Sequence, residues 1–101
     1  MHQTGNFFFE IGFDRKTGFY KGWWYKCKAH ALCFFDSVTG TGYILDFGKV
    51  KALKGKDELL GTGLFEYKEF DNRVDECKGR AWLLNIDKAI ENNLIVYWWK
   101  E

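Results

Sequence analysis

Three cysteines and one histidine are the residues of this chain with the most evident metal chemistry. Cys27, His30 and Cys33 are close in sequence, and Cys77 follows far downstream. Three thiolates and an imidazole form a legitimate tetrahedral zinc set. On an extended strand, however, Cys27 and Cys33 face one way and His30 the other, with about 20 Å between the cysteines at about 3.3 Å per residue. We therefore favour cysteines packed in the core over a metal site, and we expect no cofactor.

Aromatic residues make up 20% of the chain, and the densest group of them is interleaved with basic residues. Single-stranded nucleic acids are held by this combination, because aromatic rings stack on bases while cations neutralise phosphates. The net charge of only +1 supplies no long-range attraction to nucleic acid, so this role is the alternative and not the main expectation. Its candidate contacts lie in the range 15–28, which contains no acidic residue: Arg15, Lys16, Tyr20, Lys21, Lys26 and Lys28.

Two tandem tryptophan pairs favour a third kind of chemistry, the docking of another protein. Trp and Tyr are enriched among the few residues that carry most of the energy of protein interfaces. If each pair lies on a strand, its two members point to opposite faces, and one of them points outward. The expected partner-binding residues are Trp23, Trp24, Tyr25, Trp98 and Trp99.

The expected function is accordingly a small, non-enzymatic protein-binding module. Its partner is either a host protein or a second copy of the chain in a homodimer. A short, aromatic, lysine-rich chain is typical of phage or mobile-element accessory proteins that inhibit a host factor, for example a defence system, by covering its surface. Enzyme activity is not expected, because Ser37 is the only serine and has no base beside it, and no glycine-rich segment forms a phosphate loop.

Composition argues against several other classes. A hydrophobic fraction of 47% with 29% charged residues is typical of a globular protein and not of a disordered one. No apolar run approaches the roughly 20 residues of a membrane helix, and the first residues lack the layout of a signal peptide. An odd number of cysteines argues against a disulfide framework. We expect a single domain over residues 1–101, cytoplasmic and without a membrane partner.

Alternating apolar residues predict that strands position most of these side chains. Phe7, Phe9, Ile11 and Phe13 would share one face of the first strand, and Gly18 would close a hairpin turn. A long second strand would run from Phe19 as far as Phe35, with a bend at Gly22. Further strands are expected over 43–47, 64–70 and 94–99.

Helical patterns are short. One helical turn is expected near 50–53, and a helix over 87–92 with Asn85 or Asp87 as N-cap. The range 72–84 fits either a helix, from the spacing of Val74 and Cys77, or a strand that begins at Arg80. The expected architecture is α+β: a single small domain with a curved antiparallel β-sheet of about five strands and one or two short helices packed against it.

One segment resembles a known family. The residues Thr41-Gly42-Tyr43-Ile44-Leu45-Asp46-Phe47-Gly48-Lys49-Val50-Lys51-Ala52-Leu53 are similar to the part of the 6-pyruvoyl-tetrahydropterin synthases in which a strand with an Asp-Phe leads into a helix. That family holds zinc with histidines on its first two strands. This chain has Tyr25, Lys26 and Cys27 in that neighbourhood and lacks those histidines. The resemblance implies a strand-to-helix geometry without the zinc or the activity.

Overall fold

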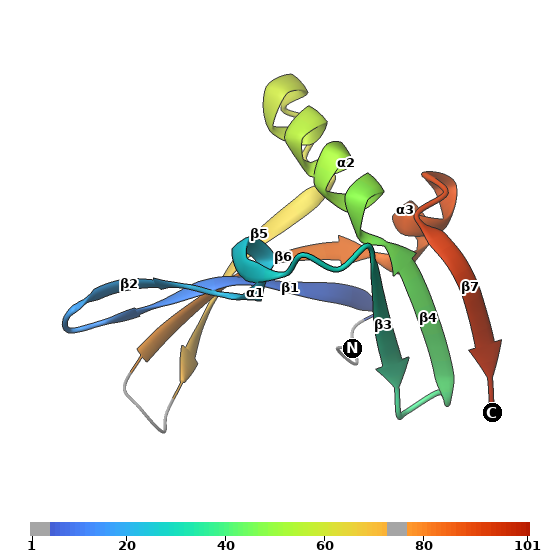
Figure 1. Ribbon diagram of the computed structural model, residues 1–101, viewed down its shortest axis with the longest axis horizontal. Helices are drawn as coiled ribbons and strands as arrows, with labels where there is room; N and C mark the ends of the chain where they lie inside the picture. Colours follow the sequence, from blue (N-terminus) through green and yellow to red (C-terminus); the bar gives the residue numbers. More distant parts are fainter. Residues whose placement is uncertain (1–4, 73–76) are drawn as a thin grey trace.

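The computed structural model describes residues 5–72 and 77–101 and shows an α+β fold of two antiparallel sheets with three helices (Figure 1). The expected fold class is confirmed. The expectation of one sheet of about five strands was loose, because seven strands form two sheets in the described residues. In chain order the elements are β1 (Asn6–Arg15), β2 (Gly18–Lys21), α1 (Trp23–Lys26), β3 (Ala31–Asp36), β4 (Thr41–Asp46), α2 (Phe47–Leu60), β5 (Phe65–Asn72), β6 (Cys77–Asn85), α3 (Ile86–Glu91) and β7 (Ile95–Lys100).

The four-stranded sheet has the order β2-β1-β6-β5, and the three-stranded sheet has the order β3-β4-β7. Their inner faces meet through aromatic rings. The Phe7 ring centroid lies 5.2 Å from that of Phe34 and 5.4 Å from that of Tyr43, and the Phe9 centroid lies 5.7 Å from that of Phe34. Tilted and edge-on rings at these distances pack closely and favour one relative placement of the sheets. This junction is the centre of the hydrophobic core.

A β-bulge ends the apolar face of β1. The register against β6 shifts between Glu10 and Gly12, so Phe13 does not join Phe7 and Phe9 in the core as the alternation predicted. Phe13 is half-buried instead and stacks on Tyr20. The hairpin turn at Lys16 and Thr17 before β2 is confirmed.

The predicted long second strand is wrong. β2 ends at Lys21, and Gly22 is the N-cap of the short helix α1, whose Trp24 packs edge-on to Phe9 with ring centroids 5.4 Å apart. A new strand, β3, begins only at Ala31. The break lets both residues of the Trp23–Trp24 pair reach the core, which a strand would forbid.

Helix α2 is also longer than the single turn expected near 50–53. Its buried residues are Phe47, Val50, Lys54 and Asp57, whose spacing marks one helical face. The Asp46 side chain caps the helix by accepting a hydrogen bond from the Lys49 amide at 3.1 Å. The strand-to-helix passage from β4 into α2 matches the geometry that the resemblance implied.

The second half of the chain agrees with most expectations. Over 77–85 the chain is strand β6, which confirms the strand alternative for that range, while residues 73–76 lie outside the described part. Helix α3 is confirmed, with Asn85 as its N-cap. The strand predicted over 94–99 is β7, at the edge of the three-stranded sheet.

Candidate docking surface

The three-stranded sheet carries its charges only at the ends of its strands. Each of its three strands has six residues and one charged residue, and that residue is the last: Asp36, Asp46 and Lys100. Two of these serve local structure, since Asp46 caps α2 and Asp36 accepts a hydrogen bond from the Val38 amide at 3.0 Å. The middle of this sheet is therefore uncharged on both faces.

The register divides its residues between two faces. One face packs on the core through Leu32, Phe34 and Leu45. The other, which we call the outer face, consists of Cys33, Phe35, Ile44, Tyr97 and Trp99, which are brought into rows by the pairings Cys33↔Ile44↔Tyr97 and Phe35↔Gly42↔Trp99. Phe35 is 42% exposed and Tyr97 60% exposed, so solvent reaches this face directly. An apolar sheet face in water is unusual unless another surface covers it.

Gly42 shapes the outer face. The Trp99 ring lies flat enough over this glycine that a Cβ atom at position 42 would overlap it. Trp99 also stacks on Tyr97, with ring centroids 6.2 Å apart and 22° between the planes. An aromatic ring over a cross-strand glycine stabilises the pairing that the glycine would otherwise weaken. Gly42 below and Tyr97 beside it thus fix the position of the Trp99 ring on the outer face.

The inner side of β7 forms a groove. Its volume is about 520 Å³, and helix α3 borders it through Ile90. Trp98 stands at its rim and is 61% exposed. This size is within the range of ligand and side-chain pockets. The groove is lined by Thr41, Tyr43, Ile90, Asn93, Ile95, Trp98 and Lys100.

The five residues expected to bind a partner do not form one surface. Trp98 and Trp99 lie on β7, on opposite faces of the sheet, as the alternation predicted. Trp24 is 7% exposed and Trp23 is half-buried against Phe9 and Phe47, so this pair belongs to the core. Sequence reasoning missed Cys33 and Phe35 because it took the range up to Phe35 as core, and on β7 it selected the tryptophans and passed over Tyr97. The signal that could have found them is the absence of any charge inside three apolar strands.

The basic residues of the nucleic-acid alternative extend from the end of β1 through the hairpin turn, β2 and α1 to the segment that follows α1. Arg15 lies over the rings of Phe13 and Tyr20, with its guanidinium carbon 5.0 and 5.5 Å from their centroids. Lys21 lies 5.7 Å from the centroid of the Tyr25 ring. These aromatic faces thus already have cations of the same chain beside them. A nucleic-acid role for Arg15, Lys16, Tyr20, Lys21, Lys26 and Lys28 stays a prediction.

The cysteines and the histidine do not meet in the described residues. Cys27 lies half-buried after α1, His30 is exposed at a bend, and Cys33 is exposed on the outer face, so the expectation that the cysteines pack in the core is wrong for Cys33. No group of three or more His, Cys, Asp or Glu side chains suited to a metal occurs among the residues described. The side chain of Cys77 lies outside them.

A second hollow of about 370 Å³ lies between α1, α2 and β6. Lys54 occupies it: its Nζ atom lies 3.9 Å from the centroid of the Trp82 ring and 2.7 Å from a Glu58 carboxylate oxygen. Cation–π contact and the ion pair together satisfy this almost fully buried ammonium. The aromatic surface of Trp82 is used internally, and the hollow is a poorer candidate for docking.

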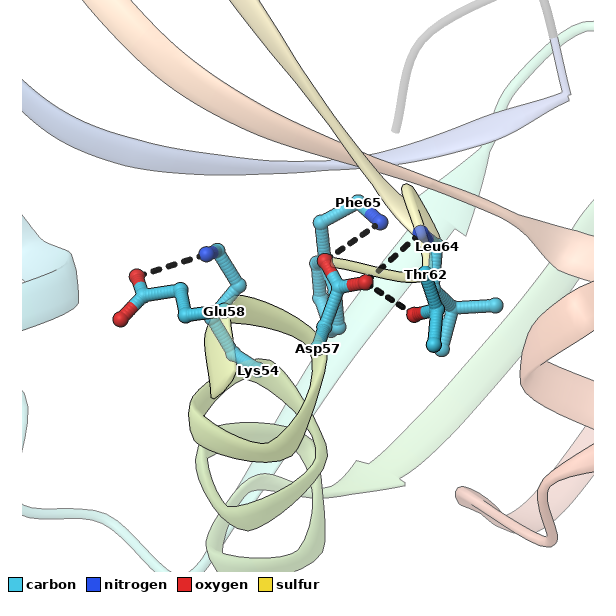
Figure 2. A network of polar contacts seen from close by, with 6 residues as sticks. All are labelled: Lys54, Asp57, Glu58, Thr62, Leu64 and Phe65. Atoms are coloured by element: carbon cyan, nitrogen blue, oxygen red, sulfur yellow. Dashed lines mark hydrogen bonds and ion pairs between the residues drawn. The ribbon is translucent and has the colours of Figure 1, made fainter. Parts of the chain in front are cut away.

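Asp57, one of two buried carboxylates among the described residues, has a structural role. It accepts hydrogen bonds from the hydroxyl of Thr62 and from the amides of Leu64 and Phe65, at 2.9 and 3.2 Å for the amides (Figure 2). Burial raises the pKa of Asp57, but these hydrogen bonds and the charge of Lys54 outweigh it, so the net pKa lies below its usual value. A carboxylate whose lone pairs are occupied by its own chain is a poor acid or base, and it ties the end of α2 to β5.

Comparison with protein-family models, with curated proteins and with solved structures finds no match for this chain. Among the described residues, no helix combines the length and the apolar character that crossing a membrane requires. The function must therefore be inferred from the surfaces themselves.

Proposed function

We propose that this protein is a small, non-enzymatic binding module that docks on another protein through the outer face of its three-stranded sheet. The observation that carries the proposal is that face itself, Cys33, Phe35, Ile44, Tyr97 and Trp99, which is apolar, uncharged and open to solvent. Interfaces concentrate their energy in a central aromatic cluster surrounded by polar residues. Here Phe35, Tyr97 and Trp99 are the cluster, and the strand ends supply the rim.

The partner that this surface fits is a protein with a complementary apolar patch. Because the outer face has no charge, electrostatic steering contributes little, and association depends on shape and buried apolar area. The biological role we propose is inhibition of a host factor by covering its surface. A small module achieves this without catalysis, as phage or mobile-element accessory proteins that act against defence systems do.

The test is affinity capture from the cells that encode the protein, with three forms of the chain. We expect the wild type and the control Glu66→Lys, which changes an exposed side chain on β5, to capture the same protein. Phe35→Lys replaces an aromatic side chain of the outer face by a charge and should abolish that capture. Circular dichroism checks that all three are folded. Equal capture by Phe35→Lys would contradict the proposal.

A further inference from the structure

We infer that β7 is the edge through which two copies of this chain join, with β7 of one copy pairing antiparallel to β7 of the other. The inference rests on the proposed function only in that both use the three-stranded sheet. It concerns the edge and the inner groove of that sheet, and on the outer face only Tyr97 and Trp99, which lie on the edge strand itself. The product is one six-stranded sheet that runs β3-β4-β7 in one copy and β7-β4-β3 in its partner.

The four edges of the two sheets differ in protection. Natural edge strands avoid unwanted pairing by being short or by carrying charges. β2 has only four residues, and β5 carries Glu66, Lys68, Glu69 and Asp71 within eight. β3, like β7, has no charge before its last residue, but it lies on the side nearer the four-stranded sheet, whereas β7 is the outermost strand (Figure 1). β7 has neither protection, since Ile95–Trp99 contains no charge and the chain has no proline.

The backbone of β7 has its hydrogen-bonding groups directed outward at known positions. The Glu101 amide donates to the Gly40 carbonyl of the neighbouring chain segment at 2.9 Å. Because successive residues of an antiparallel strand direct their N–H and C=O groups to alternate sides, those of Trp98 and Lys100 point away from β4. No described strand lies on that side of β7. These groups are the ones that an added strand would pair with.

Symmetry and charge then restrict the register. Residues that pair across an antiparallel ladder share a face, and a hydrogen-bonded pair needs outward groups on both strands. Pairing Trp98 with Trp98 of the second copy meets both conditions. It sets Tyr97 opposite Trp99 of the second copy on the outer face, and Val96 opposite Lys100, so no like charges face each other. Each copy also brings its Trp98 to the rim of the other's groove, which makes the contact self-complementary.

The surface available is enough for a modest dimer. Val96, Tyr97 and Trp98 are 66%, 60% and 61% exposed. At about 150–250 Å² per aromatic residue, and somewhat less for Val96, these three residues contribute roughly 300–400 Å² from each copy. With the paired backbones the dimer buries on the order of 1,000 Å², the lower limit for a specific interface, so we expect dissociation in the micromolar range. The net charge of +1 per chain opposes association very little.

The experiment is sedimentation equilibrium of the full chain between about 1 and 200 μM. We expect a monomer–dimer equilibrium that reaches twice the chain mass of 11.9 kDa. Trp98→Lys sets two lysines opposite each other at the symmetry axis and should raise the dissociation constant at least about 30-fold. The control Leu59→Lys changes a side chain that is 84% exposed near the end of α2 and should leave it unchanged.

A pair of substitutions separates strand pairing from simple hydrophobic contact. Trp98→Ala removes the indole, and Trp98→Pro removes the indole and the outward N–H, which does not bond to β4. We expect Trp98→Pro to dissociate further than Trp98→Ala while both keep wild-type circular dichroism. A wild type that is monomeric at 200 μM, or a dimer indifferent to Trp98→Lys, would overturn the inference. Capture of a partner that depends on Phe35 would survive either result, so the two proposals fail separately.

Discussion

The two sheets of this protein differ in the side chains that they expose to solvent. Beyond the bulge in β1, the four-stranded sheet leaves the core, and charged residues replace the apolar ones on its inner face: Arg80 pairs with Asp14 and Lys78 with Glu69, each at 2.7 Å. The three-stranded sheet has no such ion pair among the described residues and keeps aromatic side chains in contact with water. Ion pairs of the first kind are typical of a sheet surface that stays in contact with water, whereas an exposed apolar face like the second is typical of a surface that another molecule covers.

Hydrogen bonds and ion pairs also change the titration of the four-stranded sheet. The hydrogen bonds from Lys78 and then Tyr67 lower the pKa of Glu69, and the hydrogen bond to Glu69 raises the pKa of Lys78. The hydrogen bond to Asp14 likewise raises the pKa of Arg80. These groups are all solvent-exposed, so the shifts report geometry more than stability. Ion pairs and hydrogen bonds therefore stabilise the part of the four-stranded sheet beyond the bulge, whereas aromatic packing stabilises the outer face of the three-stranded sheet.

Removing the joint between the sheets should have the largest effect. Phe7 is fully buried and packs on Phe34 and Tyr43, so we expect Phe7→Ala to lower the free energy of unfolding by about 3–5 kcal/mol. Phe35→Ala on the outer face should change it by no more than about 0.5 kcal/mol. Urea denaturation measures both. Equal losses would mean that the outer face is part of the core, and the contrast between the sheets would be lost.

The second-largest loss of stability is expected when the buried carboxylate of Asp57 is replaced. Asp57→Asn weakens three hydrogen bonds at the end of α2 and should cost about 1–3 kcal/mol at neutral pH. Because the folded pKa of Asp57 lies below its usual value of 3.8, its contribution is complete above that pH and is lost as the pH falls through the lowered pKa.

Unfolding curves between pH 7 and pH 2 check this dependence. The wild type should lose stability more steeply below about pH 4 than Asp57→Asn does. Asp71→Asn, which changes an exposed carboxylate on β5, serves as the control and should follow the wild type. Parallel curves for all three forms would show that the network in Figure 2 does not support α2.

The glycines under aromatic rings provide a matched comparison between the sheets. A Cβ atom at Gly42 would overlap the Trp99 ring, and one at Gly79 would overlap the Phe70 ring. We expect Gly42→Ala and Gly79→Ala each to cost about 1–2 kcal/mol, because the ring must move from its place. Gly42→Ala should also shift the tryptophan fluorescence toward longer wavelengths as Trp99 becomes exposed, and Gly79→Ala should not.

The smallest effect is expected for the ion pair of the four-stranded sheet. Asp14 and Arg80 are both partly exposed, so Asp14→Asn should cost at most about 1 kcal/mol. Because salt screens such pairs, the difference between the wild type and the variant should shrink at about 1 M NaCl. A difference that is independent of salt would indicate packing rather than charge as the source of the stability.

Part of the fold could be predicted from local pattern, and the failures have identifiable causes. The full length of α2 was missed because two of its four buried residues, Lys54 and Asp57, are charged. A search for apolar residues at helical spacing finds Phe47 and Val50 but treats charged residues as solvent-exposed. Helix α1 was missed because Phe19, Tyr20, Trp23 and Trp24 suit a strand as well, and only contact with Phe9 and Phe47 makes the four-residue helix favourable.

The candidate surface was predicted only in part, because the alternation rule is valid only where the segment is a strand. Alternation places Trp98 and Trp99 on opposite faces of β7, and it holds because that segment is a strand. It fails for Trp23 and Trp24, because that segment is not one. Phe35 and Cys33 were assigned to a core face because local pattern identifies an apolar face but does not say which of two faces is covered.

The sequence by itself determined the α+β class, the hairpin at β1 and β2, the helix α3 with its Asn85 cap, and the strand nature of β7, because these depend on neighbours within a few residues. Tertiary structure alone decided that the strands divide into two sheets and that the three-stranded sheet has one uncovered face. Coverage depends on where a distant element lies: Phe7 and Phe9 of β1 reach one side of that sheet, and no described strand pairs along the far edge of β7. The residues left exposed by that arrangement are the ones to which we assign a function.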